Sequence, residues 1–323
     1  MKSEILIALL AIIIVSGCTG ISGVPGLTTG NTGVSGSGLE ITSFTAEPNV
    51  LYNASTVRII MEVQNLGGST VDNDNSKTFV YLTGSGIDVE SGDNRYWHRI
   101  GTDSSTECEY FDHAMKPADV VRGTPGDNDM FKWSLRAPDI DKGQTRNDIF
   151  IGRVYTEYTT SVNGNVWAYT ETESDAAKAS GRAMNSASFT STAGPVSVVA
   201  SVIPNPVITY SGDRTFSLNI RISNAASGTI YAPGQITSCP PSSLDTEDLN
   251  KVTVEIDAPG FTSTDCQGIR EEELISGKPT TVFCEMTINE ASAPTTFKSY
   301  PIKISVRYGY FTEKTASVTI QGR

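Results

Sequence analysis

The stretch Thr56-Val57-Arg58-Ile59-Ile60-Met61-Glu62-Val63, followed by Asn65-Leu66-Gly67-Gly68, decides the predicted fold. Apolar side chains alternate along the first part, which is the period of a half-buried β-strand, and the second part has the composition of a turn. The pattern returns as Phe216-Ser217-Leu218-Asn219-Ile220-Arg221-Ile222, with Asn224 and Gly228 after it. The sequence therefore predicts strands and turns in two copies.

The two copies resemble each other beyond this strand. A Pro and a Tyr precede each copy at the same spacing: Pro48 and Tyr52, then Pro206 and Tyr210. Near the ends, Arg153-Val154-Tyr155-Thr156-Glu157-Tyr158 resembles Lys303-Ile304-Ser305-Val306-Arg307-Tyr308. A repeat as long as this one indicates tandem domains rather than a solenoid of short units.

About seven short strands per copy, separated by Gly, Pro and Asn turns, are typical of an immunoglobulin-like sandwich. We predict an all-β protein with two tandem immunoglobulin-like β-sandwiches, at Leu39–Thr190 and Gly194–Arg323. The first copy is enlarged around residues 84–130. The segment Ser174–Met184 has a helix-favouring composition, which fits one short helix or a structured linker between the copies. In the first copy Asn163-Gly164 predicts a hairpin before the last strand, because both residues tolerate positive φ.

Composition agrees with this fold class and restricts the partners. Only 19% of the 323 residues are charged, and Gly, Ser, Thr and Asn are frequent, which is typical of strands joined by turns. The net charge is −12 and no run of Lys or Arg occurs, although binding to phosphates needs clustered positive charge. We therefore expect no nucleic acid partner.

Residues 1–18 have the pattern of an export signal. The apolar run Ile5–Val15 is shorter than the roughly 20 residues of a spanning helix. It ends in Val15-Ser16-Gly17-Cys18, which resembles the lipobox of prokaryotic lipoproteins. This resemblance implies cleavage before Cys18, a lipid on its thiol and a location at the outer face of the cytoplasmic membrane. Residues 19–38, rich in Gly, Ser and Thr, are then a flexible tether.

Two alternatives for this segment stay open. Lys2-Ser3-Glu4 before the apolar run resembles the processing site of archaeal type IV pilin-like proteins, which keep the hydrophobic segment. The other alternative is an uncleaved anchor helix in which Cys18 carries no lipid. In both, a helix rather than a lipid holds the protein to the membrane.

The cysteines predict disulfides. Five are present, and if Cys18 carries lipid an even number remains, which outside the cell favours pairing. We expect Cys266 to pair with Cys284, because they flank one loop and strand of the second copy. This choice leaves Cys108 and Cys239 to connect the domains. Zinc binding is the competing interpretation, but no Cys-x-x-Cys pair occurs.

One family resemblance can be named. The predicted strand Val57–Asn65 runs into Asn-Leu-Gly-Gly, and a Gly turn before an apolar strand follows later. This combination resembles the cell-adhesion-related (CARDB-like) β-sandwich modules. Such modules occur in tandem on archaeal and bacterial surface proteins. The second copy departs from the motif with Asn224-Ala225-Ala226-Ser227-Gly228. The resemblance implies an immunoglobulin-like fold and an extracellular setting, and it implies hardly any biochemistry.

Known catalytic motifs are not found in the sequence. It has no Gly-x-Ser-x-Gly elbow, no phosphate-binding loop and no His-Glu-x-x-His helix. The two histidines, His98 and His113, lie near Cys108 and Asp112 and could gather a transition metal, but the spacing matches no known ligand pattern. We predict no catalytic residue, no metal site and no cofactor.

Two short motifs lie in predicted turns of the first copy. Asp72-Asn73-Asp74-Asn75-Ser76 resembles the start of a calcium loop, but Lys77 and Thr83 stand where such a loop needs Gly and Glu, so we favour an acidic turn. Asn53-Ala54-Ser55 is a sequon, which makes Asn53 a candidate for glycosylation.

Four aromatic residues in the enlarged loop region are candidates for a contact surface: Tyr96, Trp97, Tyr110 and Phe111. Aromatic side chains are frequent at recognition surfaces, and packing on the sandwich is the alternative. We predict a non-enzymatic surface protein with a role in adhesion, envelope structure or protein interaction, with another surface protein or a glycan as partner. The alternatives are a solute- or glycan-binding module with a cleft near Tyr96 and Trp97, and a self-assembling filament subunit.

Overall fold

The computed structural model describes residues 36–87, 94–100, 107–119, 122–263, 265–266, 268–275 and 278–323. They fall within a single folded unit, Asn31–Arg323. The predicted export signal, Cys18 and the tether up to residue 35 lie outside the described residues.

The first sandwich has the strand arrangement of an immunoglobulin-like domain. One layer is the antiparallel sheet β1 (Leu39–Glu47), β3 (Thr56–Asn65), β7 (Asn128–Arg136) and β5 (His98–Arg99). The facing layer contains β6 (Cys108–Tyr110), β4 (Phe79–Gly84), the N-terminal part of β8 (Thr145–Thr170) and the C-terminal part of β18 (Phe297–Gln321), with β2 (Val50–Tyr52) pairing in parallel with β18. Four strands facing a second sheet in this order match the immunoglobulin-like arrangement.

The second sandwich repeats this arrangement with the second copy of the pattern. One layer is β10 (Val196–Ile203), β12 (Thr215–Asn224), β17 (Thr280–Ile288) and β15 (Phe261–Ser263). The facing layer contains β16 (Ile269–Glu273), β14 (Lys251–Asp257), the N-terminal part of β18 and the C-terminal part of β8, with β9 (Ser188–Ser191), β11 (Val207–Thr209) and β13 (Thr229–Tyr231) beside them. The predicted pair of immunoglobulin-like sandwiches is thus confirmed.

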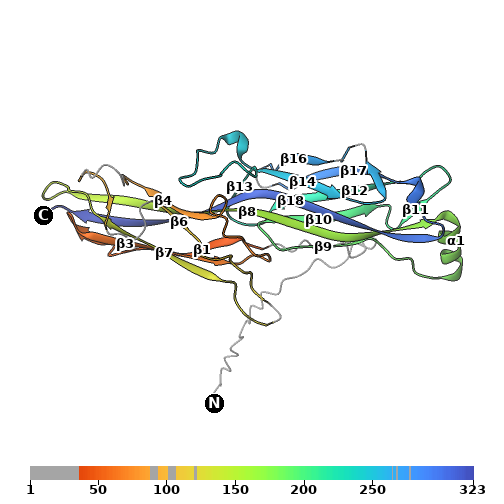
Figure 1. Ribbon diagram of the computed structural model, residues 1–323, viewed down its shortest axis with the longest axis horizontal. Helices are drawn as coiled ribbons and strands as arrows, with labels where there is room; N and C mark the ends of the chain where they lie inside the picture. Colours follow the sequence, from red (N-terminus) through yellow and green to blue (C-terminus); the bar gives the residue numbers. More distant parts are fainter. Residues whose placement is uncertain are drawn as a thin grey trace, which may run out of the picture. The chain divides into compact units, whose positions relative to one another are not determined.

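Two long strands, β8 and β18, run through both sandwiches (Figure 1). They pair antiparallel over the whole length of β18, from Thr145 opposite Gln321 to Tyr169 opposite Phe297. Each sequence copy therefore supplies its last strand to both sandwiches. The predicted bounds, Thr190 and Gly194, fall between the end of β9 and the start of β10, and β8 and β18, on either side of them in the sequence, belong to both sandwiches.

The hairpin predicted at Asn163-Gly164 is wrong. Both residues lie inside β8 and pair with Lys303 and Ile302 of β18. An added Cβ at Gly164 would lie 2.3 Å from the ring of Phe189. The glycine therefore allows the neighbouring strand β9 to approach closely, and it does not form a turn. Pairing with a distant strand thus overrides the local turn signal.

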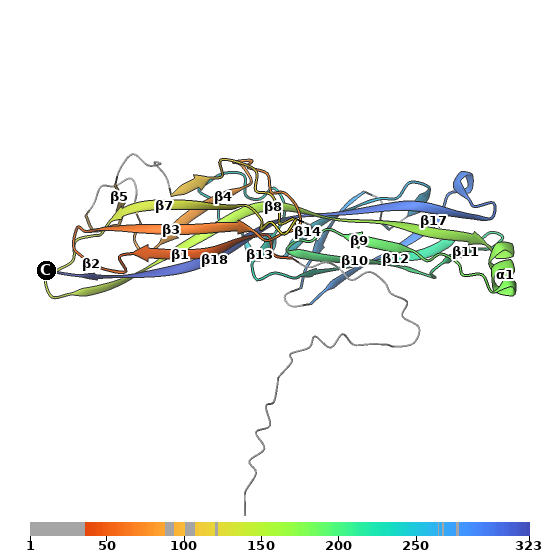
Figure 2. The ribbon, with the colours of Figure 1, turned by 90° about the horizontal axis from the view of Figure 1, so that it is seen from below.

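The alternating pattern fills the cores as predicted. Val57, Ile59, Met61 and Val63 are each 0% exposed. The second copy is buried in the same way: the inward residues of β12, from Phe216 to Ile222, are at most 3% exposed. Each fully buried apolar side chain of this size contributes about 1.5–3 kcal/mol. Figure 2 shows the resulting layers, with β1 and β3 in one sandwich and β10 and β12 in the other.

The predicted helix is present with shifted ends, as α1 (Glu171–Ser180). It begins early because the Thr170 side chain accepts a hydrogen bond from Glu173 N and caps the first turn. It ends at Gly181, whose φ of 69° takes the left-handed conformation. The enlarged region around residues 84–130 contains β5 and β6, and parts of it lie outside the described residues.

Candidate interaction surfaces

Of the four aromatic residues predicted as candidates for a contact surface, two are buried and two are exposed. Trp97 is 0% exposed, and its indole Nε1 donates to Asp148 Oδ2 at 2.6 Å. Phe111 is 2% exposed and packs edge-on against Phe131. Tyr96 and Tyr110 are 37% and 38% exposed. Trp97 and Phe111 are core residues, so a binding cleft built on Trp97 is excluded.

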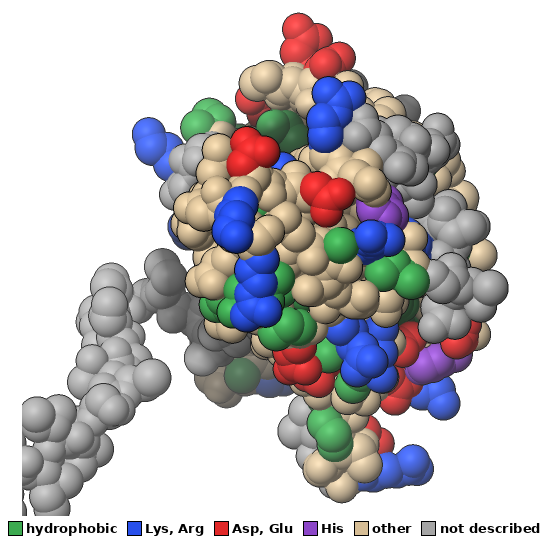
Figure 3. Space-filling model, turned by 90° about the vertical axis from the view of Figure 1, so that its left-hand side faces the viewer, with side chains coloured by type: hydrophobic (Ala, Val, Ile, Leu, Met, Phe, Trp, Pro, Cys, Tyr) green, Lys and Arg blue, Asp and Glu red, His purple; other side chains and the backbone are tan. Residues whose placement is uncertain are grey.

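The end of the first sandwich that carries the C-terminus has a mixed surface (Figure 3). Lys, Arg, Asp, Glu and hydrophobic side chains are interspersed there, without one dominant patch. Two arginines lie over exposed tyrosine rings: Arg323 over Tyr52 at 3.4 Å, and Arg95 over Tyr96 at 5.9 Å from the ring centroid. Such cation–π pairs contribute only modestly to stability at exposed sites.

The sequon residue Asn53 is part of a structured turn. Its Nδ2 donates to Ile140 O at 2.7 Å, and its Oδ1 accepts from Ile140 N at 3.4 Å. The next residue, Ala54, has a φ of 57°. The Asn53 amide is therefore half-buried and hydrogen-bonded to the Ile140 backbone, which restricts the direction in which an attached glycan can leave the surface.

Two of the residues considered for metal or calcium binding are engaged in other ways. Cys108 is bonded to Cys239, so it offers no free thiolate. Asp74 Oδ1 accepts from Ser76 N at 3.0 Å and Ser76 Oγ at 2.6 Å, and these bonds lower the pKa of the Asp74 carboxyl. Such an arrangement is an acidic turn of the kind favoured above. Among the described residues, no three His, Cys, Asp or Glu side chains gather into a possible metal site.

The Cys108–Cys239 disulfide connects the two sequence copies, with a Cα–Cα distance of 5.9 Å. It ties β6 to residues 232–250, a segment we call the strap. Around it lies a second small core of Phe79, Tyr155, Tyr231 and Ile236. Tyr155 contacts Phe79 with ring centroids 5.2 Å apart. The strap thus covers the outer face of the long-stranded sheet in the first sandwich.

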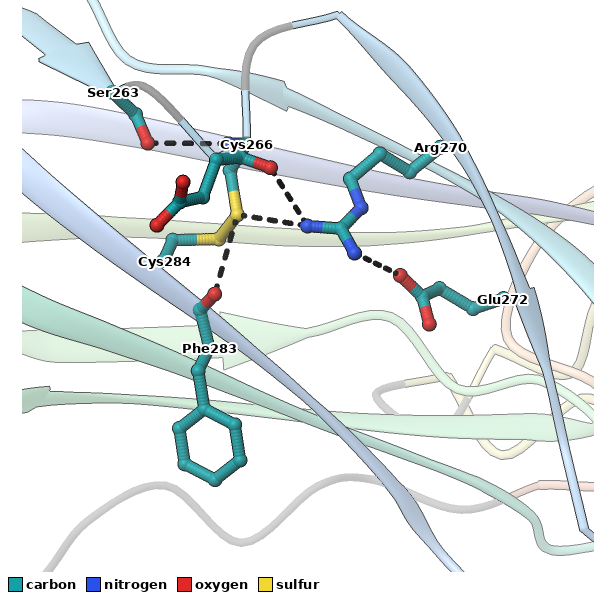
Figure 4. Close-up of a disulfide and its surroundings, with 7 residues drawn as sticks. Ser263, Cys266, Arg270, Glu272, Phe283 and Cys284 are labelled. Atoms are coloured by element: carbon teal, nitrogen blue, oxygen red, sulfur yellow. Dashed lines mark hydrogen bonds and ion pairs between the residues drawn. A yellow bond between two sulfur atoms is a disulfide. The ribbon is translucent and has the colours of Figure 1, made fainter.

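The Cys266–Cys284 disulfide lies within the second sandwich (Figure 4). It ties the loop after β15 to β17, with a Cα–Cα distance of 5.5 Å. Arg270 is held beside it, because its Nη1 donates to Asp265 O at 2.7 Å and its Nη2 lies 3.0 Å from Glu272 Oε1. Both pairings are those expected from the cysteine pattern.

Two buried tyrosines occupy the centre of the β8–β18 pair. Tyr158 and Tyr308 lie directly opposite each other, with ring centroids 6.0 Å apart. The Tyr158 hydroxyl accepts a hydrogen bond from Leu39 N, and the Tyr308 hydroxyl accepts one from Val196 N at 3.2 Å. Leu39 and Val196 begin β1 and β10, so each tyrosine positions the first strand of one sandwich. Burial raises the pKa of Tyr158 well above its usual range and that of Tyr308 to about 12.

The first described residues, 36–38, lie at this junction. Gly36 N donates to Gly194 O at 3.2 Å, and Gly68 N donates to Ala193 O at 3.2 Å. The Tyr158 hydroxyl would lie 2.4 Å from a Cβ added at Gly38. Gly36 and Gly38 therefore lie where the two sandwiches meet.

A polar groove of about 820 Å³ lies beside the junction. Its walls carry Asp72, Asp74 and Glu157 as well as Lys77 and Arg307. Glu157 is already engaged, because its Oε1 accepts from Gly234 N at 2.6 Å and its Oε2 lies 3.5 Å from Lys77 Nζ. The acidic and basic side chains of the groove therefore partly neutralise one another.

In the described part of the chain, no helix has both the length and the apolar character to cross a membrane.

Comparison with known proteins assigns no family. No family model and no curated protein matches the chain. Among solved structures, the Yersinia pseudotuberculosis adhesin InvE is 9% identical, with a TM-score of 0.18 over 87% of this chain and 60% of that chain. The D0-D1 domain of intimin is 8% identical, with a TM-score of 0.16 over 87% of this chain and 98% of that chain. The Enterococcus faecalis MSCRAMM ACE, which binds its ligands by the collagen Hug model, is 8% identical, with a TM-score of 0.14 over 87% of this chain and 95% of that chain. At these TM-scores the likeness carries no argument about function.

Proposed function

We propose that this chain is an exported, non-enzymatic surface protein, held by a lipid on Cys18 at the outer face of the cytoplasmic membrane. Its two sandwiches serve adhesion or envelope structure. The observation that carries the proposal is the Cys108–Cys239 disulfide, which crosses between the two sequence copies. Disulfides persist in oxidising compartments and are rare in the cytosol, where thiols are kept reduced.

The position of residues 36–39 supports a tethered protein. Residue 36 lies beside Gly194, and Leu39 is held by the Tyr158 hydroxyl. A pull on the N-terminal segment acts along β1, which is antiparallel to β3 over eight residue pairs. Backbone hydrogen bonds that lie across the direction of pulling share the load, which suits a protein that holds a cell to a partner.

The exchange of strands supports the same role. Because β8 and β18 belong to both sandwiches, neither sandwich can rotate about a flexible linker. Such a unit keeps its contact surfaces in one arrangement, and rigid surfaces lose less conformational entropy on binding. We propose another surface protein or a glycan as partner, and we retain Asn53 as a proposed glycosylation site.

The decisive experiment determines the mature N-terminus and its location in cells of the native host. We expect mass spectrometry to find a chain that begins at Cys18 and carries a diacylglyceryl group. Protease added to intact cells should degrade the protein, and Cys18→Ser should release it from the membrane fraction.

Three results would contradict parts of the proposal. A mature chain that begins at Glu4 supports the pilin-like alternative. A free Cys18 thiol without acyl mass removes the lipid anchor. Complete protection from external protease, with all other cysteines reduced, removes the surface location.

A further inference from the structure

The Asn163-Gly164 motif, which makes no turn, lies in a shallow depression on the second sandwich. The depression has a volume of about 500 Å³, within the ~300–1,000 Å³ of small-ligand pockets. Its lining includes six polar side chains: Asn163, Asn165, Ser188, Thr190, Asp257 and Lys303. It opens on the outer face of the sheet that contains β8 and β18.

The strand register places these side chains in rows. Thr190 of β9 is opposite Asn163 of β8, which is opposite Lys303 of β18, which is opposite Asp257 of β14. Residues opposite each other share a face, and strands lie about 4.8 Å apart, so this row spans about 14 Å. Two residues further along β8, Asn165 is opposite Ser188. The outer face thus presents an ordered array of amides, hydroxyls, one ammonium and one carboxylate.

These polar groups are available to a ligand. Asn163, Asn165 and Lys303 are exposed. Within the described part of the chain, their side chains have no hydrogen-bond or ion-pair partner. The one carboxylate and the one ammonium balance, so the depression is nearly neutral on a protein of net charge −12. Such a lining suits an uncharged ligand with many hydroxyl groups.

An aromatic platform continues the same face. Trp167 lies two residues beyond Asn165 on β8, is half-buried and is opposite Ser299. Its ring centroid is 6.2 Å from that of Phe297, which is 47% exposed. A flat indole or phenyl ring packs well on the apolar C–H face of a sugar ring. From Asn163 to the level of the exposed Phe297, which is opposite the buried Tyr169, the face extends about 20 Å at ~3.3 Å per residue, enough for several sugar units.

The corresponding outer face of the first sandwich is apolar and covered. There Phe79, Tyr155 and Phe311 lie opposite one another on β4, β8 and β18. The strap covers these rings and Tyr231 packs against them. An apolar row is buried in one sandwich, whereas the row of the other is polar and open.

We propose that this outer face, built on Asn163, Asn165, Lys303 and Trp167, binds a neutral oligosaccharide. The inference rests on the proposed surface function, since it names the chemical class of the partner. The amides and hydroxyls hydrogen-bond the sugar hydroxyls, and Trp167 stacks on one sugar ring.

The test uses the full chain from residue 18 with Cys18→Ser, titrated with cellotriose, maltotriose, mannotriose and N,N′,N″-triacetylchitotriose. Trp97 and Trp133 are 0% and 1% exposed, so a change in tryptophan emission reports on Trp167. We expect at least one trisaccharide to bind with a Kd on the order of 1 mM, measured by calorimetry and by fluorescence.

Variants separate this face from the rest of the surface. Trp167→Ala and the double variant Asn163→Ala, Asn165→Ala should each weaken binding at least tenfold. Phe283→Ala is the matched control, because Phe283 is 66% exposed on β17 of the other sheet, and it should bind normally. Circular dichroism and thermal unfolding verify that each variant is folded.

Either of two results overturns the inference: none of the four trisaccharides binds at 20-fold above the expected Kd, or the folded face variants bind as tightly as the control. Binding is measured on purified lipid-free protein, so it does not depend on location in the cell. A failure here leaves the protease and mass-spectrometry test of the surface function unaffected.

Discussion

Removal of the Cys108–Cys239 disulfide should destabilise the protein more than removal of Cys266–Cys284. The first closes a separation of 131 residues and the second a separation of 18. In the chain-entropy model the loss of each cross-link costs about 5 and about 3 kcal/mol respectively. The difference arises in the unfolded chain, which gains more freedom when the longer loop opens.

The two double variants are Cys108→Ala with Cys239→Ala, and Cys266→Ala with Cys284→Ala. Cys108, Cys266 and Cys284 are at most 3% exposed, so loss of their sulfur atoms adds a similar small packing cost in both variants. Urea unfolding followed by circular dichroism gives the free energy of unfolding of each. We expect the Cys108 variant to lose about 2 kcal/mol more than the Cys266 variant.

Limited proteolysis adds a local measurement. Without the bond to Cys108, the strap should be cut earlier than any site in β8 or β18, because those strands keep their paired hydrogen bonds. The reasoning is refuted if the Cys266 variant is the less stable of the two, or if the Cys108 variant loses less than about 1 kcal/mol.

Three further predictions concern the junction and the strap. Tyr158→Phe leaves the buried Leu39 N–H without its acceptor and should cost about 1–3 kcal/mol, with faster hydrogen exchange at the Leu39 amide; unchanged exchange would contradict this. Tyr308 has a pKa of about 12 in the folded state against 10.0 ordinarily, so its burial stabilises the protein fully below pH 10 and this contribution is lost as the pH rises through 12. The free energy of unfolding should therefore differ less between pH 9 and pH 11.5 in Tyr308→Phe than in the unchanged protein. An equal difference in the two proteins would contradict the raised pKa of Tyr308. Gly309→Ala would place a Cβ 2.0 Å from the Tyr231 ring and should lower the stability by about 1–3 kcal/mol through overpacking, measured by urea unfolding; a neutral effect would show that Tyr231 moves freely.

Local sequence patterns predicted much of the fold. The alternation in Thr56–Val63 placed Val57, Ile59 and Met61 in the core, where the structure has them fully buried. The composition near Ser174 predicted a helix, and its ends follow from the Thr170 cap and Gly181. These features depend on near neighbours in the chain, so a short stretch of sequence contains the information.

The candidate surfaces were less predictable. Trp97 and Tyr96 are adjacent in polar surroundings, yet only the Tyr96 side chain reaches solvent, because Asp148 from β8 pairs with the Trp97 indole. The array on the outer face was missed altogether, since Asn163 and Lys303 are far apart in the sequence and meet only through the β8–β18 register. A signal was present in retrospect: Asn163 and Asn165 end an alternating run from Glu157 to Asn165 whose outward residues are all polar.

The sequence by itself determined that the chain is all-β and that it contains two copies of one sandwich pattern, and it favoured disulfides among its cysteines. Hydrophobic period and residue chemistry carry these properties, and both are local. Only the tertiary structure decided which strand completes which sandwich. A last strand has the same inward pattern whether it folds back on its own copy or continues into the other, so the choice depends on the total of distant contacts along β8 and β18. That choice places the tyrosine pair at the junction, the strap over one outer face, and the open polar array on the other.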